Sequence, residues 1–489
     1  MKKKTHLLMP LIFAGGEEPG YYVDQTGGND ANGGESSGDA WKTIAKVNGV
    51  AFNPGDNIFF KRGETWAEEL VVPSSGTSGN QIVFGAYDYG ARPIIDGGGA
   101  RGNCIDVDAQ DYITIQDIEV KDSTTINLDG NGDTLNLILK RVKSTGGTAT
   151  GIWFDTGGGE IIDCEIGTAG AWSLVINTSG AYIIRNTNIT AGLYGMLLRG
   201  SSTGTAEGCT ITGVTGEFGF SIGGTGGWTL TNCVAHTCAH ASMVGFRLGD
   251  SATHNYIDCV AYGMGGDGFD NRGDGTMICT RCLAYNNGTL GSENSGDGYT
   301  SHIAGGSLVL NYCIAYGNTK SGVAVAGGDL TAYNCTFYAN NDEAGVGWVS
   351  NLGIGVSTVD GTVTIRNCIT QGHEFEVYVH DTAVPGITLD FDYNCFYDSE
   401  GGDAFHYDGT DYNWADWKTQ SGGDANSLNE NPFMVAPATD NFHLQGKSPC
   451  RDVGTDVGLT EDFDEVTVPQ ETNPAIGAYE PDLTQSWPG

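Results

Sequence analysis

Basic residues are scarce in this chain of 489 residues. It has 23 lysines and arginines against 60 aspartates and glutamates, which gives a formal net charge of −37. Nucleic acid is not expected as a partner, because phosphate binding needs a basic surface. An acidic polysaccharide would also be repelled, unless Ca²⁺ or a local group of arginines and lysines mediates the contact.

Long hydrophobic runs and familiar catalytic motifs are also missing. A membrane span needs about 20 apolar residues, and no segment reaches that length, so no membrane span is predicted. The chain has no phosphate-binding loop, no GxSxG motif and no matched pair of CxxC motifs. The sequence CTRC at Cys279–Cys282 stands alone, which argues against a structural zinc site.

The N-terminal peptide, residues 1–20, combines three lysines with a short apolar run from Leu7 to Ala14. Two interpretations stay open. The peptide is either a secretory signal or an apolar anchor that docks into a partner protein.

Cysteine, in contrast, recurs with a regular spacing. With Thr187 filling one place, a similar short phrase returns every 22 to 33 residues, and cysteine occupies the same place in it at positions 164, 209, 233, 259, 282, 313, 335, 368 and 395. A period in this range predicts a solenoid. The spacing favours reduced cysteines stacked inside the solenoid as small hydrophobic residues over disulfides.

The phrase VTIRNCIT shows how one coil is built. Val363 and Ile365 alternate inward with period two, and Cys368 points inward three residues later, so the strand bends at Asn367. Asparagine tolerates the left-handed backbone conformation that such a bend needs. The same place is held by Asn186, Asn232, Asn334 and Asn394.

The predicted architecture is all-β, a parallel β-helix with atypical ends. Solenoids need terminal repeats that close the core. We expect an N-terminal peptide at 1–20, a cap with the first strands at 21–93, coils at 94–400 and an irregular capping segment at 401–489.

The repeated phrases, with PGDNIFFKRGETW near the start and FHLQGKSPCRDVGTD and IGAYE near the end, resemble the right-handed parallel β-helix proteins of the pectate-lyase-like superfamily. The resemblance extends from Tyr21 to Glu480 and implies a right-handed coil. The superfamily includes polysaccharide lyases, glycoside hydrolases, epimerases, phage tailspikes and adhesins, and the fold does not select among them.

Outward residues of successive coils in such a fold stack about 4.8 Å apart, so a site is a stripe across neighbouring coils. Polar residues are densest in three consecutive coils, where strands begin after Gly245, Gly268 and Gly298. The candidates are Asp270, Arg272 and His302 for catalysis, Asp267 and Asp297 for a metal, and Arg247, Trp153 and Arg199 for substrate binding, with Trp348 as a second aromatic platform.

Two chemistries fit these candidates. In a lyase, Asp267 and Asp297 would hold Ca²⁺, which takes several oxygen ligands, and Arg272 or His302 would abstract a proton from a uronic acid. In a hydrolase, Asp270 and Asp297 would act as acid and base. No lysine is expected in the acidic cluster, which disfavours a lyase. The structural alternative is that the GDGF and GDGY phrases are ordinary Asp-Gly turns.

Three functions stay open at this level. The first is a virion-surface protein of a phage (a tailspike, tail fibre or decoration protein) that recognises and degrades a polysaccharide or a host surface glycan. Its N-terminal peptide would dock onto a virion partner, and resemblance to tailspikes implies a homotrimer. The second is a secreted lyase or glycoside hydrolase acting on an acidic glycan. The third is a non-catalytic adhesin or structural shaft. All three place the protein on a virion surface or outside the cell.

Overall fold

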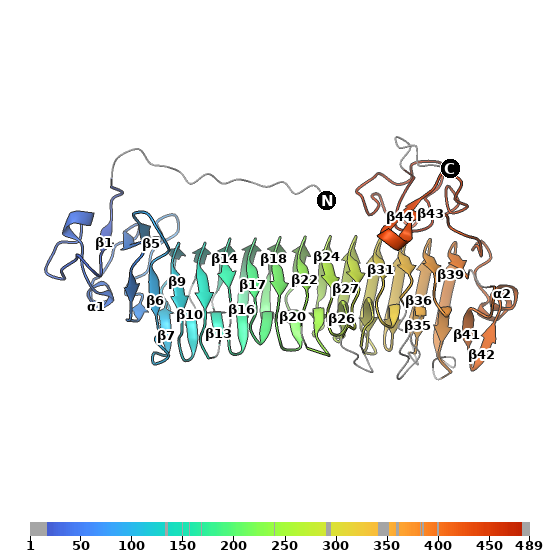
Figure 1. Ribbon diagram of the computed structural model, residues 1–489, viewed down its shortest axis with the longest axis horizontal. Coiled ribbons are helices and arrows are strands. Elements are labelled where there is room, and N and C mark those ends of the chain that lie inside the picture. The colour runs from blue at the N-terminus through green and yellow to red at the C-terminus, as the bar shows by residue number, and fades with distance from the viewer. Residues whose placement is uncertain are drawn as a thin grey trace.

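The computed structural model shows one elongated solenoid of short parallel strands (Figure 1). The residues that it describes are 17–132, 135–148, 150–155, 157–167, 169–238, 240–289, 295–340, 352–357, 361–381, 383, 386–398 and 401–481. Among these residues, neither α-helix is long and apolar enough to cross a membrane.

Each turn of the solenoid, called a coil here, contributes one strand to each of three parallel ladders. Ladder 1 comprises β4 (Leu70–Val71), β7 (Asn103–Asp106), β10 (Ile126–Gly130), β13 (Thr150–Phe154), β20 (Phe218–Gly224), β23 (Val244–Leu248), β26 (Phe269–Asn271), β29 (Tyr299–Ser301), β32 (Ser321–Val325), β35 (Leu352–Val356), β38 (Phe375–Val379) and β41 (Phe405–Tyr407).

Ladder 2 follows ladder 1 in each coil. It comprises β1 (Tyr21–Val23), β2 (Asn57–Lys61), β5 (Ile82–Tyr87), β8 (Ile113–Gln116), β11 (Leu137–Lys140), β14 (Gly158–Ile162), β21 (Trp228–Thr231), β24 (Thr253–Ile257), β27 (Thr276–Thr280), β30 (Ser307–Asn311), β33 (Asp329–Tyr333), β36 (Gly361–Arg366) and β39 (Ile387–Asp392). The long strands β16 (Trp172–Arg185) and β18 (Tyr194–Glu207) run through ladders 1 and 2 without a break.

Ladder 3 closes each coil as a sheet of 14 strands. It comprises β3 (Thr65–Trp66), β6 (Ile94–Asp96), β9 (Glu119–Lys121), β12 (Lys143–Thr145), β15 (Glu165–Ile166), β17 (Asn188–Thr190), β19 (Thr210–Thr212), β22 (Val234–His236), β25 (Val260–Tyr262), β28 (Leu283–Tyr285), β31 (Ile314–Tyr316), β34 (Thr336–Tyr338), β37 (Ile369–Gln371) and β40 (Cys395–Tyr397). The parallel β-helix predicted from the sequence is confirmed. Its regular coils begin at β2, inside the segment 21–93 that is predicted to hold the cap and first strands.

The core is a continuous stack of inward side chains. Several ladder 1 strands have a glycine at or next to their start, such as Gly245, Gly268 and Gly298, called a coil glycine here, and the residue after it points inward. Phe246, Phe269 and Tyr299 are fully buried, and their rings stack at centroid distances of 4.7 and 5.0 Å. Identical register from coil to coil therefore places like side chains over one another, which fixes the outward rows as firmly as the inward ones.

A left-handed residue joins ladder 2 to ladder 3 in each coil. The φ angles of Asn232, Asn334 and Asn367 are 53°, 53° and 56°, so the bend predicted at these asparagines is confirmed. Asp258, Arg281 and Tyr312 adopt the same conformation in other coils. The inward cysteine follows directly, and all thirteen cysteines are buried and free of disulfides. Burial raises the pKa of the Cys164 thiol to about 12, so this thiol stays protonated.

The last coil departs from the predicted register. Cys395 pairs with Ile369 rather than with Cys368, and the left-handed residue is Tyr393, not Asn394. Asn394 takes the inward place, where its side-chain oxygen accepts the amide of Cys368 at 3.0 Å. Cys395 is thus one residue past the inward position, and it packs in an outer cluster with the C-terminal segment.

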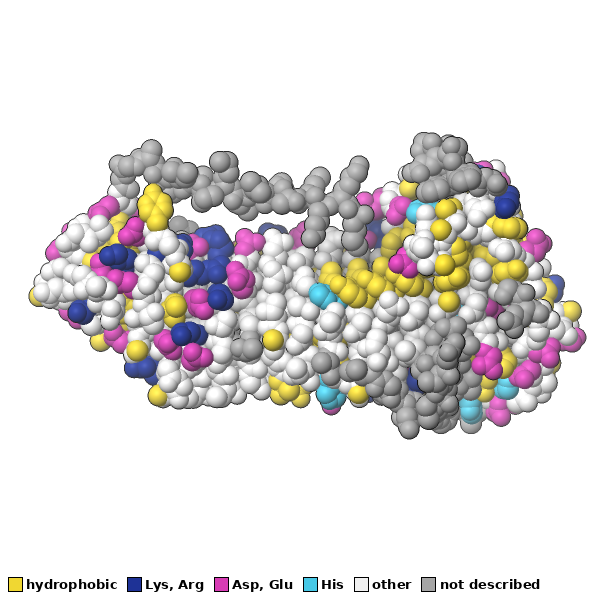
Figure 2. Space-filling view, in the orientation of Figure 1, with side chains coloured by type: hydrophobic (Ala, Val, Ile, Leu, Met, Phe, Trp, Pro, Cys, Tyr) yellow, Lys and Arg dark blue, Asp and Glu magenta, His cyan; other side chains and the backbone are white. Residues whose placement is uncertain are grey.

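The two ends of the solenoid are closed differently. At one end, α1 (Ile44–Asn48) buries Ile44 and Val47, and at the other α2 (Trp414–Ser421) buries Trp417 (Figure 1). The remaining C-terminal chain, which includes β43 (Met434–Ala436) and β44 (Asn441–Leu444), folds back along the outer face of ladder 3. Figure 2 shows a band of hydrophobic side chains on the coils that leads under this segment.

Candidate functional site

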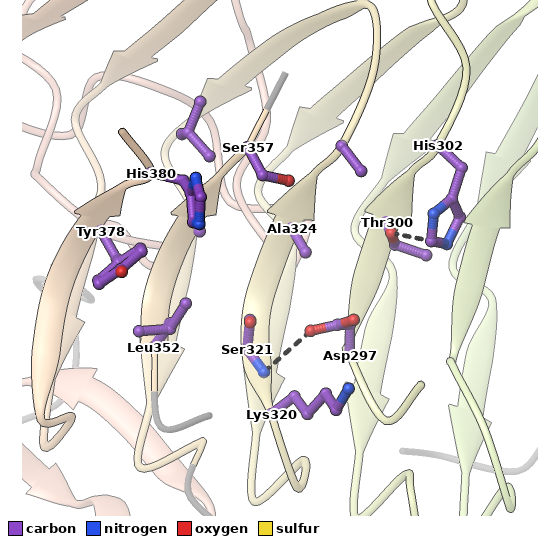
Figure 3. A pocket seen from close by; sticks show the side chains of 13 residues that line it. Asp297, Thr300, His302, Lys320, Ser321, Ala324, Leu352, Ser357, Tyr378 and His380 are labelled. Atoms are coloured by element: carbon purple, nitrogen blue, oxygen red, sulfur yellow. Dashed lines mark hydrogen bonds between the residues drawn. The ribbon is translucent and has the colours of Figure 1, made fainter. Parts of the chain in front are cut away.

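The outward face of ladder 1 carries two adjoining pockets over β23, β26, β29, β32, β35 and β38. The larger, of 430 Å³, is lined by Glu217, Phe218, Ser242, Val244, Arg247, Arg272 and Ser295. The smaller, of 330 Å³, includes Asp297, Thr300, His302, Lys320, Tyr378 and His380 in its lining (Figure 3). Arg247 is paired with Asp270 on β26, and Asp270 with Thr300 on β29. Strand β26 therefore lies between the two pockets.

Glycines in register bring the backbones of these coils close together beneath the site. A Cβ atom added at Gly268 would lie 2.7 Å from the carbonyl oxygen of Gly298. The amide of Gly268 donates to the carbonyl of Asp297 at 3.0 Å. This close approach sets Asp267 and Asp297, which precede the two glycines, side by side on adjacent coils.

Asp267 and Asp297 each use one oxygen to bind the backbone of the next coil. Oδ1 of Asp267 accepts the amides of Gly296 and Asp297 at 2.6 and 3.0 Å, and Oδ1 of Asp297 accepts the amide of Ser321 at 3.1 Å. These bonds join neighbouring coils, so they are not the local Asp-Gly turn bonds of the structural alternative. Oδ2 of Asp267 is buried without a hydrogen-bond partner.

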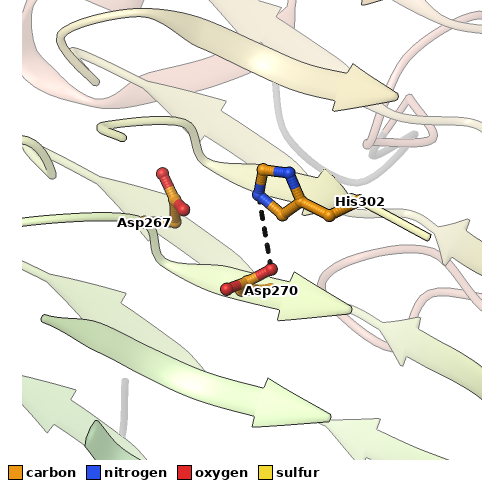
Figure 4. Close-up of side chains that lie close together, drawn as sticks. All are labelled: Asp267, Asp270 and His302. Carbon is orange, nitrogen blue, oxygen red and sulfur yellow. Dashed lines mark ion pairs between the residues drawn. The ribbon is translucent and has the colours of Figure 1, made fainter. Parts of the chain in front are cut away.

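Asp270 is the centre of the polar cluster. It is fully buried, and its Oδ2 accepts the Nε–H of Arg272 at 2.6 Å. Its Oδ1 has no hydrogen-bond partner and lies 3.6 Å from Nε2 of His302 (Figure 4). The same histidine nitrogen lies 3.3 Å from Oγ1 of Thr300.

Burial controls the protonation of these groups. Burial and the negative charge of Asp267 raise the pKa of Asp270 to about 7, against the opposing effect of Arg272 and Arg247. Burial and the charge of Asp267 raise the pKa of Asp297 to about 7 as well, while burial lowers the pKa of His302. Near neutral pH, Asp270 and Asp297 are therefore each protonated in part of the molecules, because burial and a nearby like charge disfavour ionisation.

The same cluster offers atoms to a metal ion. One ligand atom each from Asp267, Asp270 and His302 lie within 4.8 Å of one another. Asp297 is not in this group, and two carboxylates with one imidazole nitrogen fall short of the six to eight oxygens that Ca²⁺ takes. The donors do not fit Ca²⁺ well, and the Ca²⁺ predicted at Asp267 and Asp297 stays an untested prediction.

The structure gathers most of the predicted site residues on three adjacent coils: Arg247, Asp267, Asp270, Arg272, Asp297 and His302. Trp153 and Arg199 are separate. Trp153 lies on β13, four strands before Arg247 in the same outward row. Arg199 donates to Oδ1 of Asn177 at 2.7 Å and is opposite Gly223 of β20. Neither lines either of these two pockets, and Trp348 lies outside the described residues.

The sequence-based expectation of a cluster without lysine is wrong. Lys320 lines the smaller pocket with Asp297, and its positive charge opposes the rise in the pKa of Asp297. Its backbone amide donates to the carbonyl of Gly296 at 3.1 Å, which places it beside the turn before Asp297. The sequence does indicate this position, because Lys320 precedes Gly322 by two residues, as Gly296 precedes Gly298.

Comparisons with known proteins bear on the fold more than on the site. The family model described as a right handed beta helix region matches residues 124–247 and 218–396, which together are more than half of the chain. A lacto-N-biosidase of Bifidobacterium longum subsp. longum is 32% identical over 90 residues, which are 17% of this chain and 6% of that protein. The chain thus matches only a small part of that relative.

Solved structures are similar only at a distance. The complex of XylC with xylose has a TM-score of 0.45 at 11% identity, covering 96% of this chain and 99% of that chain. Pectate lyase Pel9A has a TM-score of 0.34 at 16% identity, covering 94% and 96%. The assignment of the fold is carried by the family match and by the strand register.

Proposed function

Because the chain belongs to the right-handed β-helix family, whose outward rows build sites across coils, we propose that it is a glycoside hydrolase. Its substrate is a polysaccharide or oligosaccharide bound along the groove over β23, β26, β29 and β32. The observation that carries the proposal is the pair Asp270 and Asp297. They are buried carboxyl groups on neighbouring coils, each with a pKa raised to about 7. Asp297 lines the smaller pocket, and Asp270 lies on β26, between strands that line the two pockets.

The surroundings of the two carboxyl groups assign their roles. Asp270 is held by the guanidinium of Arg272 at 2.6 Å, which favours its ionised form, so it acts as the base. Asp297 accepts the amide of Ser321 through Oδ1, and burial and the charge of Asp267 disfavour its ionised form, so we assign it as the acid. Proton transfer of this kind works best when the pKa lies near the working pH.

The reaction balances with these two groups and one water molecule. Asp270 takes a proton from the water, whose oxygen forms a bond to the anomeric carbon. The bond from that carbon to the leaving oxygen breaks, and Asp297 donates its proton to the leaving oxygen. Asp267 transfers no proton. Its charge keeps the pKa of both partners high.

A carbohydrate substrate has further support. The curated relative that matches over 90 residues is named a lacto-N-biosidase. The two pockets also lie on either side of β26, so together they offer places for more than one sugar of a chain.

The decisive experiment is the release of new reducing ends from a panel of neutral and acidic polysaccharides. Asp270→Asn and Asp297→Asn should each lower kcat by about 10²- to 10⁴-fold, the usual contribution of a positioned acid or base. Asp390→Asn removes a carboxylate that pairs with Arg366 on ladder 2, away from the groove, and it should leave the rate unchanged. Activity that survives both site substitutions would reject the assignment.

β-Elimination is the second candidate, and Lys320 is the observation that favours it. Lys320 lines the smaller pocket with Asp297. It would supply the lyase base that was not predicted there from the sequence. Unsaturated products that absorb in the ultraviolet, lost in Lys320→Met, would establish a lyase in place of a hydrolase. Glycan binding without any product would favour the adhesin.

The place of action is a separate part of the proposal. A virion-surface or extracellular location, docking through residues 1–20 and a homotrimer stay predictions, and residues 1–16 lie outside the described residues. Co-sedimentation of the native protein with phage particles tests the location, and light scattering of the purified chain tests the trimer.

A further inference from the structure

The larger pocket has no part in the proton transfers assigned to Asp270 and Asp297. We propose that it binds an anionic substituent of the substrate, a carboxylate or a sulfate ester, through Arg247, Arg272 and Ser295. This inference rests on the proposed function, because it places the substituent on the sugar next to the bond that is cleaved.

Arg247 differs from most of the other arginines of the chain. Its guanidinium lies 4.4 Å from the ring centroid of Phe218, and its Nε is buried without a hydrogen-bond partner. It forms no ion pair within the described part of the chain. Ion pairs with carboxylates are formed by the arginines at positions 62, 92, 141, 185, 272, 281, 366 and 451.

A guanidinium that is half-buried and unpaired is costly unless a ligand supplies the acceptors. Burial lowers the pKa of Arg247, the charge of Asp270 opposes this effect, and the like charge of Arg272 adds to it. An anion bound between the two arginines would remove both penalties. The paired arginines have no such need.

Ser295 is a second, independent indication of a ligand. It lines the same pocket and is 6% exposed, yet its hydroxyl has no hydrogen-bond partner. Buried hydroxyl groups are nearly always bonded, so this one points to a group that the pocket receives.

The pocket is rich in hydrogen-bond donors. Arg272 donates its Nε–H to Asp270, and its side chain is 44% exposed, which leaves its outer N–H groups available at the surface. Ser242 adds a hydroxyl, and Glu217 adds the one carboxylate of the lining. A ligand with two or three acceptor oxygens matches this set, and carboxylate and sulfate are such groups.

The register fixes where that group lies relative to the bond that is cleaved. Arg247 on β23 pairs with Asp270 on β26, so the two side chains are about one strand spacing, ~4.8 Å, apart along the axis. A substituent held by Arg247 thus belongs to the sugar beside the one that Asp270 and its water attack. Because the chain carries a net charge of −37, it repels anions elsewhere, and the pocket is where an anionic glycan can be selected.

Binding by calorimetry to three oligosaccharides of equal length tests the inference: an oligogalacturonate, a sulfated galactan and a neutral xylo-oligosaccharide. At least one of the two anionic probes should bind better than the neutral one. Arg247→Gln should weaken binding of that probe by about 10- to 100-fold, the range for a hydrogen bond to a charged group. It should leave the neutral probe unchanged. In turnover, the loss should appear in KM rather than in kcat.

Arg185→Gln is the matched control, because it removes the same charge from an exposed pair with Glu207 at the ladder 2 end of β16. It should affect no probe, and circular dichroism should show both variants folded.

Equal effects of Arg247→Gln and Arg185→Gln would overturn the inference, as would failure of both anionic probes to bind. Turnover of neutral glycans alone would overturn it and leave the hydrolase intact. Arg247-dependent binding without turnover would keep it and reject the hydrolase.

Discussion

At the scale of single residues, the site consists of groups that burial keeps out of their ordinary charge state. Asp270 and Asp297 are buried at positions where hydrophobic residues would stabilise the coil. Active sites that hold such groups lower the free energy of unfolding, because the groups are kept for their chemical function and not for packing. The raised pKa values give this reduction a definite dependence on pH.

Asp297→Asn should make the protein more stable at pH 8 than at pH 5, relative to the parent. The folded-state pKa of Asp297 is raised to about 7, against about 3.9 in the unfolded chain. The folded state therefore binds more protons between these values, and the parent loses stability as the pH rises from about 4 to about 7. Asparagine carries no charge, so the variant escapes this loss, which is on the order of 4 kcal/mol at about 1.4 kcal/mol per pKa unit.

Melting temperatures across pH 4 to 8 measure the effect. Asp390→Asn, which breaks an exposed pair with Arg366, should give no gain at pH 8. A difference between Asp297→Asn and the parent that stays constant with pH would show that the carboxyl group is not perturbed by burial.

Sequence reasoning reached this site through alternation alone. Once the residue after a coil glycine points inward, the outward rows follow, and Arg247, Asp270 and Thr300 fall on one of them. Lys320 was missed because it lies in a turn, where side-chain direction does not follow period two. Trp153 and Arg199 lie on earlier coils than the two pockets, because distance along the axis depends on counting coils. Their role in substrate binding stays a prediction.

At the scale of the strand, close backbone approach at the coil glycines holds the site together. Gly268→Ala should destabilise the fold by about 1–3 kcal/mol, the usual cost of overpacking. The added Cβ would meet the carbonyl oxygen of Gly298 at 2.7 Å and the Cβ of Ala284 at 3.0 Å. Urea unfolding measures the loss.

Gly223→Ala is the control for this substitution, because Gly223 is also in ladder 1 but has nothing within 4 Å of an added Cβ. Its stability should match that of the parent. Equal destabilisation by the two alanines would mean that strand propensity, and not the close contact, sets the cost.

A row of buried asparagines was not predicted from the sequence, although its spacing is regular there. Asn287 donates to Oδ1 of Asn318 at 2.9 Å, and Asn318 donates to Oδ1 of Asn340 at 2.8 Å. Each asparagine follows a ladder 3 tyrosine by two residues, at Tyr285, Tyr316 and Tyr338. Amphipathic patterning assigns polar residues to the surface. Asparagines that are buried because they bond to one another are therefore predicted to be exposed.

The misplaced Cys395 has a related cause. A repeat phrase aligned by cysteine assumes that every cysteine is inward, but Cys395 is buried from outside, by the C-terminal segment. Burial by a distant segment leaves no local trace in the sequence. The fold class was therefore predictable from periodicity, whereas register at the end of the solenoid needed the tertiary contact.

At the scale of the whole molecule, a solenoid distributes its stability among neighbours. Each coil contacts only the adjacent coils and whatever packs on its outer face. The C-terminal segment packs on ladder 3 through a separate hydrophobic cluster. It is also tied by hydrogen bonds such as that from Nδ2 of Asn334 to the carbonyl of Ala475 at 2.9 Å. The segment is thus a layer added to the rod, not a part of its core.

Phe442→Ala should undock this layer without unfolding the coils. The ring of Phe442 is buried between Tyr316 and Tyr338, at centroid distances of 5.2 and 5.5 Å, and its removal should cost about 3–5 kcal/mol of docking free energy. Hydrogen exchange should rise in β43, β44 and the outer amides of ladder 3, while ladders 1 and 2 stay protected. Val453→Ala, at a side chain that is 39% exposed in the same segment, should change neither. If protection falls throughout the rod in Phe442→Ala, the segment and the coils form one cooperative unit, and the groove would then depend on a surface on the other side of the solenoid.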